Sequence, residues 1–280
     1  MKARLVRWMD VAAGRVRDAI ERRELSRWAN APFGATPKEQ PEAYRRLWDE
    51  ARAKKYPDVD AFEQACGAAI DSEWLDRLAL TTQVTIKASD ICYQHGRVLY
   101  AAVTRYVRTQ GGRQLNVLET GTARGFSSVC LARAMQDSGA TGKILTFDVL
   151  PHDVPMLWNC LLDVDGPRTR AQLLADWSDL VDTFIVFERG DTRRTLAGLA
   201  APRVHIAFLD AVHEYEYVMA EYAAVRGRQR PGDLLLFDDY TPSRYPGVVA
   251  AADEICRVDG YRTTIVRAHE HRGYLVAEKQ

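Results

Sequence analysis

Three carboxylates and one histidine follow two short apolar runs in the second half of the chain. Asp210 and His213 come after one run, and the adjacent pair Asp238 and Asp239 comes after the other. If both runs are parallel strands of one sheet, their carboxyl ends open on the same edge, where the aspartates can converge. Unpaired carboxylates that lie close together repel one another and take up protons. A divalent cation would resolve that conflict, so the pattern predicts a metal site formed by Asp210, Asp238 and Asp239.

The ligands in this set are all oxygens, which favours a hard cation such as Mg²⁺. Such an ion can accept a substrate oxygen at an open position, lower the pKa of a bound hydroxyl and orient it. His213 is the candidate general base, because an imidazole can take up a proton at neutral pH. Two plainer interpretations stay open: Asp238 and Asp239 could cap the turn before Pro242, and His213 could be a structural histidine.

A glycine-containing turn lies upstream, where the apolar run ending in Glu119 passes through Gly121 and Gly125 into a helical pattern. Glycines let a ligand approach the backbone, and the N–H groups of a helix N-terminus can donate to polar ligand groups. A nicotinamide site would require G-x-G-x-x-G, but the second glycine is replaced by Ala123. Glu119 would repel a pyrophosphate and attract the ammonium and sulfonium charges of S-adenosylmethionine. The turn therefore favours S-adenosylmethionine over NAD, and an ordinary strand-to-helix turn is the alternative.

Two further acids follow apolar runs between these sites. Asp148 ends the run Lys143–Asp148, where an acid can accept hydrogen bonds from both ribose hydroxyls of a nucleoside. Asp191 lies in the turn Gly190-Asp191-Thr192, which could meet an adenine edge. Each acid taken alone could be a solvated helix cap. The three acids follow successive strands in the order that a cofactor site requires, which favours such a site over three unrelated helix caps. They are Glu119, Asp148 and Asp191.

The stretch from Leu115 to Glu278 resembles class I S-adenosylmethionine-dependent methyltransferases. ETGTARGFSS is similar to the first motif of that family, ILTFD to its second strand, and FERGDT to its adenine-side turn. The resemblance implies a role for each matching position: Glu119, Gly121, Thr122, Gly125 and Ser127 on the methionine side, Asp148 at the ribose, and Asp191 at the adenine.

The acidic set resembles the metal site of catechol O-methyltransferase and of the metal-dependent O-methyltransferases that modify antibiotic sugars. In that family the base lies two or three residues beyond the first metal acid, and these positions are Val212 and His213 here. The resemblance implies methyl transfer from S-adenosylmethionine to a hydroxyl of a small molecule, assisted by Mg²⁺ or another hard divalent cation. The acceptor would be a phenol, a catechol or a sugar of a secondary metabolite or glycan.

Three other functions stay open. The protein could be a metal-independent methyltransferase with another acceptor, or a non-catalytic nucleotide-binding protein that acts through a partner. An oxidoreductase that uses NAD ranks behind both.

After residue 110 the sequence alternates between short apolar runs and segments with helical periodicity. This alternation is typical of a parallel sheet with helices on both faces, and such a sheet would position the residues named above. We predict a Rossmann-like, doubly wound α/β fold whose mostly parallel sheet ends in an antiparallel hairpin. The five predicted parallel strands are Asn116–Glu119, Lys143–Asp148, Thr183–Glu188, His205–Leu209 and Asp233–Phe237, and the hairpin is Arg262–Ala268 with Gly273–Ala277. The segment Leu150–Asp182 is longer than one crossover needs and could form a pocket wall or extra scaffold.

Residues 1–110 are predicted to be a helical extension that serves as a lid, a dimer contact or both, and residues 111–280 to be the catalytic domain. Apolar residues recur at three- and four-residue intervals in four stretches, as in amphipathic helices. These are Arg4–Trp28, Ala43–Lys54, Val59–Leu78 and Asp90–Thr109.

The composition of the 280 residues limits the partners. Lys plus Arg and Asp plus Glu are both 38, whereas a protein that tracks a phosphate backbone usually has a basic excess, so we expect no nucleic-acid partner. The first residues lack a secretion signal, and no stretch approaches the roughly 18 apolar residues of a membrane span. The 5 cysteines include no C-x-x-C pair and indicate reduced core residues. We expect a cytoplasmic protein that has no membrane partner and forms a homo-oligomer such as a dimer.

Overall fold

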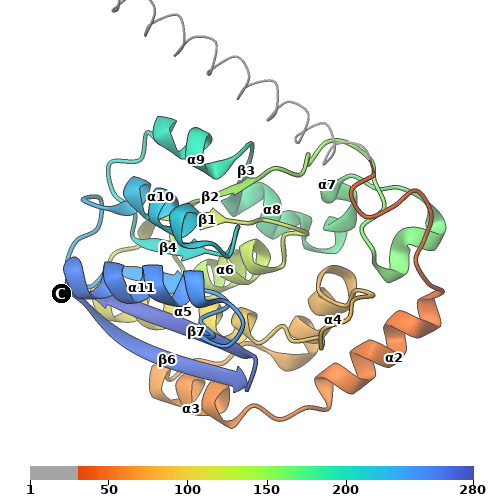
Figure 1. Ribbon diagram of the computed structural model, residues 1–280, viewed down its shortest axis with the longest axis horizontal. Coiled ribbons are helices and arrows are strands. Elements are labelled where there is room, and N and C mark those ends of the chain that lie inside the picture. Colours follow the sequence, from red (N-terminus) through yellow and green to blue (C-terminus); the bar gives the residue numbers. More distant parts are fainter. Residues whose placement is uncertain (1–30) are drawn as a thin grey trace, which may run out of the picture.

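The computed structural model describes residues 31–280. The helix predicted over Arg4–Trp28 lies outside the described residues. A seven-stranded sheet in the order β3-β2-β1-β4-β5-β7-β6 forms the centre of the described part (Figure 1). Its strands are β1 (Gln114–Thr120), β2 (Thr141–Asp148), β3 (Ile185–Arg189), β4 (Ile206–Leu209), β5 (Leu234–Phe237), β6 (Tyr261–His269) and β7 (Arg272–Lys279).

The first five strands pair in parallel, whereas β7 is antiparallel to both β5 and β6. The predicted Rossmann-like class with a C-terminal antiparallel hairpin is therefore confirmed. Parallel pairing brings the carboxyl ends of β1, β2, β4 and β5 to one edge. This edge carries the acids singled out in the sequence.

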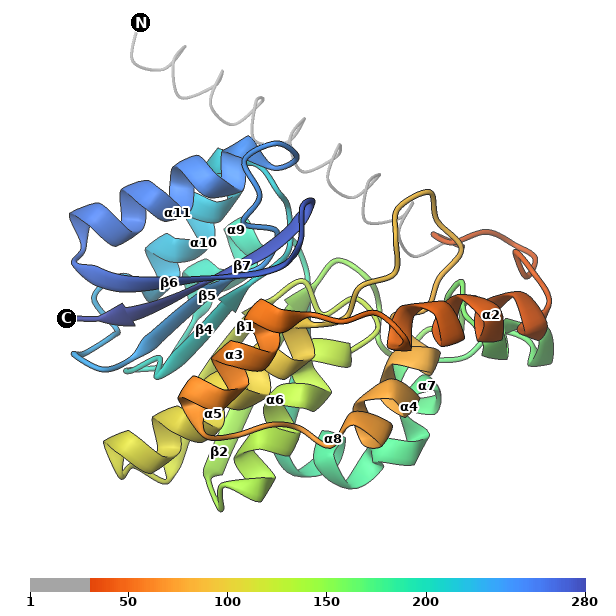
Figure 2. The ribbon, with the colours of Figure 1, turned by 90° about the horizontal axis from the view of Figure 1, so that it is seen from below.

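Helices cover both faces of the sheet, as Figure 2 shows. One face carries α3 (Pro57–Cys66), α5 (His95–Gln110), α6 (Phe126–Asp137) and α8 (Ser178–Phe184), and the other carries α9 (Thr192–Thr195), α10 (Tyr215–Val225) and α11 (Pro246–Val258). Beside the first group lie α2 (Pro41–Arg52), α4 (Ser72–Thr82) and α7 (Arg170–Leu173). Buried apolar side chains form one large cluster on each face. The first cluster includes residues of α2–α5 as well as the sheet, so the described part of the N-terminal helices shares a core with the sheet.

Several predicted elements differ from the structure in their bounds, and one is split into two helices. The single helix predicted over Val59–Leu78 is wrong, because α3 ends at Gly67, which adopts a left-handed φ of 63° at the C-cap. A second helix, α4, begins where the carboxylate of Asp71 accepts a hydrogen bond from the Trp74 N–H. The strand predicted from Thr183 begins only at Ile185, because the preceding residues complete α8. The helix predicted from Asp90 begins at His95.

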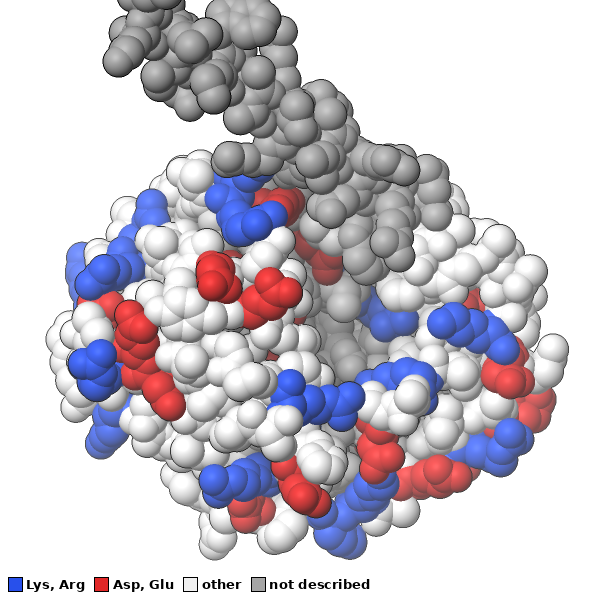
Figure 3. Space-filling model, in the orientation of Figure 1, with Lys and Arg blue, Asp and Glu red and all other residues white. Residues whose placement is uncertain are grey.

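Acidic and basic side chains are interspersed on the face shown in Figure 3, in keeping with their equal numbers in the sequence. All 5 cysteines are unpaired and buried. Within residues 31–280, no helix combines the length and the apolar character needed to cross a bilayer.

The insertion between β2 and β3 is attached to the N-terminal helices through Asn159. Its side-chain oxygen accepts hydrogen bonds from the Tyr44 hydroxyl of α2 and from the Ile86 N–H, each at 3.1 Å, and its amide donates to the Ile86 carbonyl at 3.0 Å. The neighbouring Trp158 is fully buried, and its ring lies 6.1 Å from that of Phe33. One buried amide thus joins α2, the segment before α5 and the insertion.

We expect Asn159→Gly to lower the free energy of unfolding by about 2–4 kcal/mol, because it leaves the buried donors and acceptor of Tyr44 and Ile86 without a partner. Glycine accommodates the positive φ of 53° at this position, so the change removes the amide without straining the backbone. Urea unfolding measures the effect. Val164→Ala, at an exposed site of the same insertion, should stay within about 0.5 kcal/mol of the wild type, and equal stabilities for both variants would contradict the prediction.

Candidate active site

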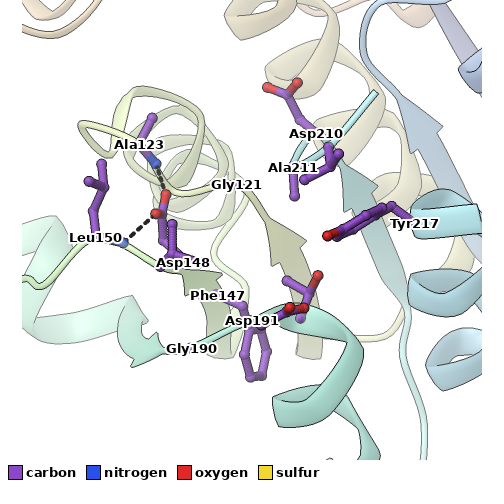
Figure 4. A pocket seen from close by; sticks show the side chains of 13 residues that line it. Gly121, Ala123, Phe147, Asp148, Leu150, Gly190, Asp191, Asp210, Ala211 and Tyr217 are labelled. Atoms are coloured by element: carbon purple, nitrogen blue, oxygen red, sulfur yellow. Dashed lines mark hydrogen bonds between the residues drawn. The ribbon is translucent and has the colours of Figure 1, made fainter. Parts of the chain in front are cut away.

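A cavity of about 360 Å³ opens at the carboxyl edge of the sheet (Figure 4). Among the residues expected to bind a cofactor, it brings together Gly121 after β1, Asp148 at the end of β2 and Asp191 after β3. Asp210, which follows β4, lines the same cavity. The rest of the lining is Ala123, Phe147, Val149, Leu150, Gly190, Thr192, Ala211, Val212 and Tyr217.

Gly121 allows the turns after β1 and β4 to touch. Its φ is +85°, and a Cβ at this position would lie 2.0 Å from the carbonyl oxygen of Asp210. That contact involves backbone on both sides, so a side chain at residue 121 would separate the two turns. The second glycine of the motif, Gly125, has a φ of +88° and lies against the Leu174 side chain, outside the cavity lining.

Asp148 accepts two backbone hydrogen bonds at the cavity wall. Oδ2 accepts from the Ala123 N–H at 2.6 Å, and Oδ1 accepts from the Leu150 N–H at 2.7 Å, as the dashed lines in Figure 4 show. A carboxylate has about four acceptor sites. Each Asp148 oxygen therefore keeps capacity for one more donor, such as a ribose hydroxyl.

Asp191 is the N-cap of α9 and accepts a hydrogen bond from the Arg193 N–H at 3.0 Å. The Arg193 guanidinium also pairs with Asp191 at 2.6 Å and lies 4.0 Å from the centroid of the Tyr217 ring. Burial opposes ionisation of Asp191, but the hydrogen bonds and charge of Arg193 outweigh it and lower the pKa of the carboxyl. The residue thus acts as a helix cap and lines the cavity at the same time.

The other residues expected on the methionine side lie outside the cavity lining. Glu119 is fully buried below the turn, where it accepts a hydrogen bond from the Ser128 hydroxyl, and burial raises the pKa of its carboxyl. The Thr122 hydroxyl pairs with that of Thr146 at 2.5 Å, and Ser127 is buried beside Glu119. Of the five residues in this group only Gly121 reaches the cavity, and the predicted role of the others stays a prediction.

His213 lies between two of the predicted metal ligands. Its Nε2 atom is 3.4 Å from Oδ1 of Asp210 and 3.1 Å from Oδ2 of Asp239. One ligand atom from each of these three residues lies within 4.8 Å of the others. The three side chains therefore form a group with the size of a cation site.

Asp238 faces a different partner, Arg272 at the start of β7. Arg272 donates from Nη2 to Oδ2 of Asp238 at 2.5 Å and from Nη1 to Oδ1 of Asp239 at 2.7 Å. The second oxygen of Asp238 accepts a hydrogen bond from the Asp239 N–H at 2.7 Å. The sequence argument that these carboxylates are unpaired is therefore wrong for both Asp238 and Asp239, because antiparallel pairing of β7 with β5 brings Arg272 beside them.

The charges in this group are unequal. Burial acts against ionisation of Asp238, but the Arg272 charge outweighs it and lowers the pKa of that carboxyl. Burial and the charge of Asp238 raise the pKa of Asp239 to about 6. Burial together with both neighbouring acids raises the pKa of Asp210 well above its ordinary value. Asp210 and Asp239 thus remain the acids that a further cation or a proton would stabilise.

Glu221 is a buried acid below the cavity that the sequence analysis did not single out. Its carboxylate accepts hydrogen bonds from the hydroxyls of Thr120 at 2.8 Å and Thr192 at 2.7 Å. The Thr120 carbonyl in turn accepts from the Asp210 N–H at 3.1 Å. Glu221 therefore links the ends of β1 and β4 to the turn that carries Asp191. The sequence marks Glu221 only as an acid among the apolar residues of a helix, which does not indicate its place near the cavity.

We expect Glu221 to make the protein less stable as the pH rises from about 4.5 to about 7. Burial raises the pKa of Glu221 from 4.5 to about 7, so the folded state binds the proton more tightly than the unfolded state. This proton contributes its full stabilisation below pH 4.5, and the contribution is lost as the pH rises through about 7. Its upper limit is about 3 kcal/mol of unfolding free energy. Urea unfolding of Glu221→Gln at several pH values should show a flatter pH dependence than the wild type. Parallel curves for the two proteins would exclude this assignment.

Comparison with known proteins identifies a domain type in the part of the chain that carries these residues. Residues 118–240 match a family described as a methyltransferase domain, and this segment contains Glu119, Asp148, Asp210 and the pair Asp238-Asp239. A comparison with curated proteins gave no match.

Solved structures share the fold at low sequence identity. The cofactor-bound structure of Rv0187 from MTB is 19% identical, with a TM-score of 0.51 over 81% of this chain and 98% of that chain. The O-methyltransferase TomG from Streptomyces achromogenes, which is involved in tomaymycin synthesis and was solved with SAM, is 18% identical, with a TM-score of 0.50 over 76% of this chain and 92% of that chain. The chain thus has the fold of class I S-adenosylmethionine-dependent methyltransferases, as its motifs indicated.

Proposed function

We propose that this protein transfers a methyl group from S-adenosylmethionine to a hydroxyl of a small molecule. The observation that carries the proposal is the continuity of the cavity, which runs from Asp148 and Asp191 to Asp210, the neighbour of His213. A nucleoside site and a proton-accepting group thus share one edge of the sheet. The methyltransferase-domain match and the similarity to TomG, an O-methyltransferase bound to SAM, support the reaction class.

The cofactor would bind with its ribose at Asp148 and its adenine near Asp191. The remaining acceptor sites of Asp148 suit two ribose hydroxyls, and the rings of Phe147 and Tyr217 line the same cavity. The methionine end would then lie toward Gly121 and the turn that follows it. Glu119, Thr122, Gly125 and Ser127 would shape that end from behind the turn.

His213 would act as the general base of the reaction. The acceptor oxygen attacks the methyl carbon, the bond from that carbon to sulfur breaks, and S-adenosylhomocysteine leaves with the electron pair of that bond. The hydroxyl proton would pass to the imidazole of His213, and the carboxylates of Asp210 and Asp239, which lie 3.4 and 3.1 Å from its Nε2 atom, would stabilise the resulting imidazolium. Asp210 and Asp239 would thus orient His213 even before any cation binds.

The acidic group also fits a hard divalent cation such as Mg²⁺. Asp210 and the Oδ2 atom of Asp239 are available on the side of His213, whereas Asp238 could join only after releasing Arg272. When bound, the cation would lower the pKa of an acceptor hydroxyl and hold it in line with the methyl carbon. Asp210 and Asp239 would be its main ligands.

Arg272 favours a second candidate, in which methyl transfer needs no metal. A guanidinium that pairs with both Asp238 and Asp239 supplies positive charge that a cation would otherwise bring. The acceptor could then be a hydroxyl or another nucleophile.

We further propose that the acceptor is a phenol, catechol or sugar, and that the protein works in the cytoplasm as a homo-oligomer without nucleic-acid or membrane partners. Residues 1–110 would serve as a lid or as a dimer contact, and residues 111–280 would form the catalytic unit.

Substitution of His213 should separate catalysis from cofactor binding. For His213→Gln we expect kcat to fall about 10²- to 10⁴-fold, the usual contribution of a general base. The Kd of S-adenosylhomocysteine, measured by calorimetry, should stay within about threefold of the wild type, because His213 does not line the cavity. His271→Gln, at an exposed histidine of the hairpin turn, should retain full activity. A kcat of His213→Gln equal to that of the wild type would assign His213 a structural role.

Removal of metal ions distinguishes the metal-assisted reaction from the metal-independent one. If a cation assists the reaction, EDTA should abolish activity and Mg²⁺ or Mn²⁺ should restore it. Calorimetric titration of Mn²⁺ should show one site in the wild type and none in Asp239→Asn. Asp253→Asn, at an exposed acid of α11, is the matched control and should bind Mn²⁺ normally. Full activity in EDTA with no Mn²⁺ binding would establish the metal-independent reaction.

A further inference from the structure

Arg170, the first residue of α7 in the insertion, is a buried cation without an acidic partner. It is 1% exposed, and no carboxylate within residues 31–280 forms an ion pair with it. One of its terminal nitrogens, Nη2, is buried and has no hydrogen-bond partner. Burying a charge in this way is costly, and an apolar side chain of similar size is often tolerated as well or better at such sites. Packing alone therefore does not account for an arginine here.

The Arg170 side chain contacts the turn that follows β1. Its Nε atom donates a hydrogen bond to the carbonyl oxygen of Ala123 at 3.0 Å. Its guanidinium lies 5.5 Å from the ring centroid of Trp158 and 5.3 Å from that of Phe187, both within the range of cation–π attraction. The two rings offset part of the desolvation cost and fix the direction of the guanidinium.

Ala123 is held from both sides. Its carbonyl accepts the hydrogen bond from Arg170, and its N–H donates to Oδ2 of Asp148 at 2.6 Å. Ala123 has a φ of +45°, a left-handed conformation that is unfavourable for alanine and that requires such support. Ala123 and Asp148 both line the cavity, on the side shown in Figure 4.

The acids that act on Arg170 through space are Asp148 and Glu119. Burial lowers the pKa of Arg170, and the charges of these two acids act in the opposite direction. The attraction is mutual, so the guanidinium also draws the Asp148 carboxylate toward the side on which Ala123 lies. Only a charged carboxylate accepts hydrogen bonds at both oxygens without offering a donor of its own.

From these contacts we infer that Arg170 is a positioning residue for the ribose of the cofactor. It holds the Ala123 turn and the Asp148 carboxylate in the arrangement in which each carboxylate oxygen accepts one backbone N–H and one ribose hydroxyl. This inference rests on the proposed cofactor. It also gives the insertion between β2 and β3 a specific task, because the guanidinium comes from that segment and not from the sheet.

The first test is the affinity for S-adenosylhomocysteine, measured by calorimetry on the full chain. In Arg170→Met the Kd should rise about tenfold or more, since a charge-assisted contact to the turn and the attraction to Asp148 are both lost. Arg170→Lys keeps the charge and loses the Nε donor, so its Kd should lie between those of the wild type and Arg170→Met. Arg168→Met is the matched control: that arginine, two positions earlier, pairs with the exposed Asp165 at 2.9 Å, and its loss should leave the Kd unchanged.

A second ligand separates positioning from a merely structural role. An analogue of S-adenosylhomocysteine without the 2′- and 3′-hydroxyls cannot use Asp148, so both Arg170 variants should bind it within about threefold of the wild type. In a double-mutant cycle, Arg170→Met should have little further effect once Asp148→Asn is present. Equal losses for the two ligands, or additive losses in the cycle, would overturn the inference.

The possible failures can be told apart. If the wild type does not bind S-adenosylhomocysteine, the proposed cofactor is wrong and the inference fails with it. If the wild type binds it and Arg170→Met binds it equally well, only the inference fails. Circular dichroism shows whether Arg170→Met folds, and if it does not, the ratio of the two ligand affinities in Arg170→Lys decides the question.

Discussion

The close approach of two backbone turns at Gly121 is the constraint on which the site depends. With the Asp210 carbonyl 2.0 Å from where a Cβ would be, the turn after β1 and the turn after β4 form one packed unit. The Asp210 N–H also donates to the Thr120 carbonyl at 3.1 Å. The turn after β1 and Asp210 therefore cannot move independently, and the cavity that Gly121 lines also reaches Asp210, the neighbour of His213.

Around this contact, buried charges are balanced by groups from distant parts of the chain. Arg272 comes from the hairpin and pairs with Asp238 and Asp239. Glu221 comes from α10 and is satisfied by two threonine hydroxyls below the cavity. Arg170 comes from the insertion. Because burying a charge or polar group is costly without compensation, each of these contacts helps to hold one element against the sheet edge.

The sequence predicted the parts of this arrangement that depend on local pattern. Alternation of apolar runs and helical periods predicted the sheet, and the positions of the acids at strand ends predicted that they would lie at its carboxyl edge, where the structure places Asp148, Asp191 and Asp210 around one cavity. The partners of those acids were missed because they are set by tertiary pairing. Arg272 reaches Asp238 only through the antiparallel register of β7 on β5, and Arg170 reaches Ala123 only through the folding of an insertion that has no repeating pattern. Gly67 was missed for a different reason: the apolar period continues across it, although its left-handed conformation ends the helix.

The insertion between β2 and β3, which the sequence left open as a pocket wall or extra scaffold, makes specific contacts in the structure. Asn159 binds the Tyr44 hydroxyl on one side, and the adjacent Trp158 carbonyl accepts a hydrogen bond from Arg124 of the glycine turn at 2.5 Å. The Trp158 ring also faces Arg170. Contacts thus run without interruption from α2 through the insertion to the turn that precedes α6. Because protein cores are closely packed, α2 and the turn after β1 are parts of one structural unit, although α3, α4, α5 and β1 separate them in the sequence.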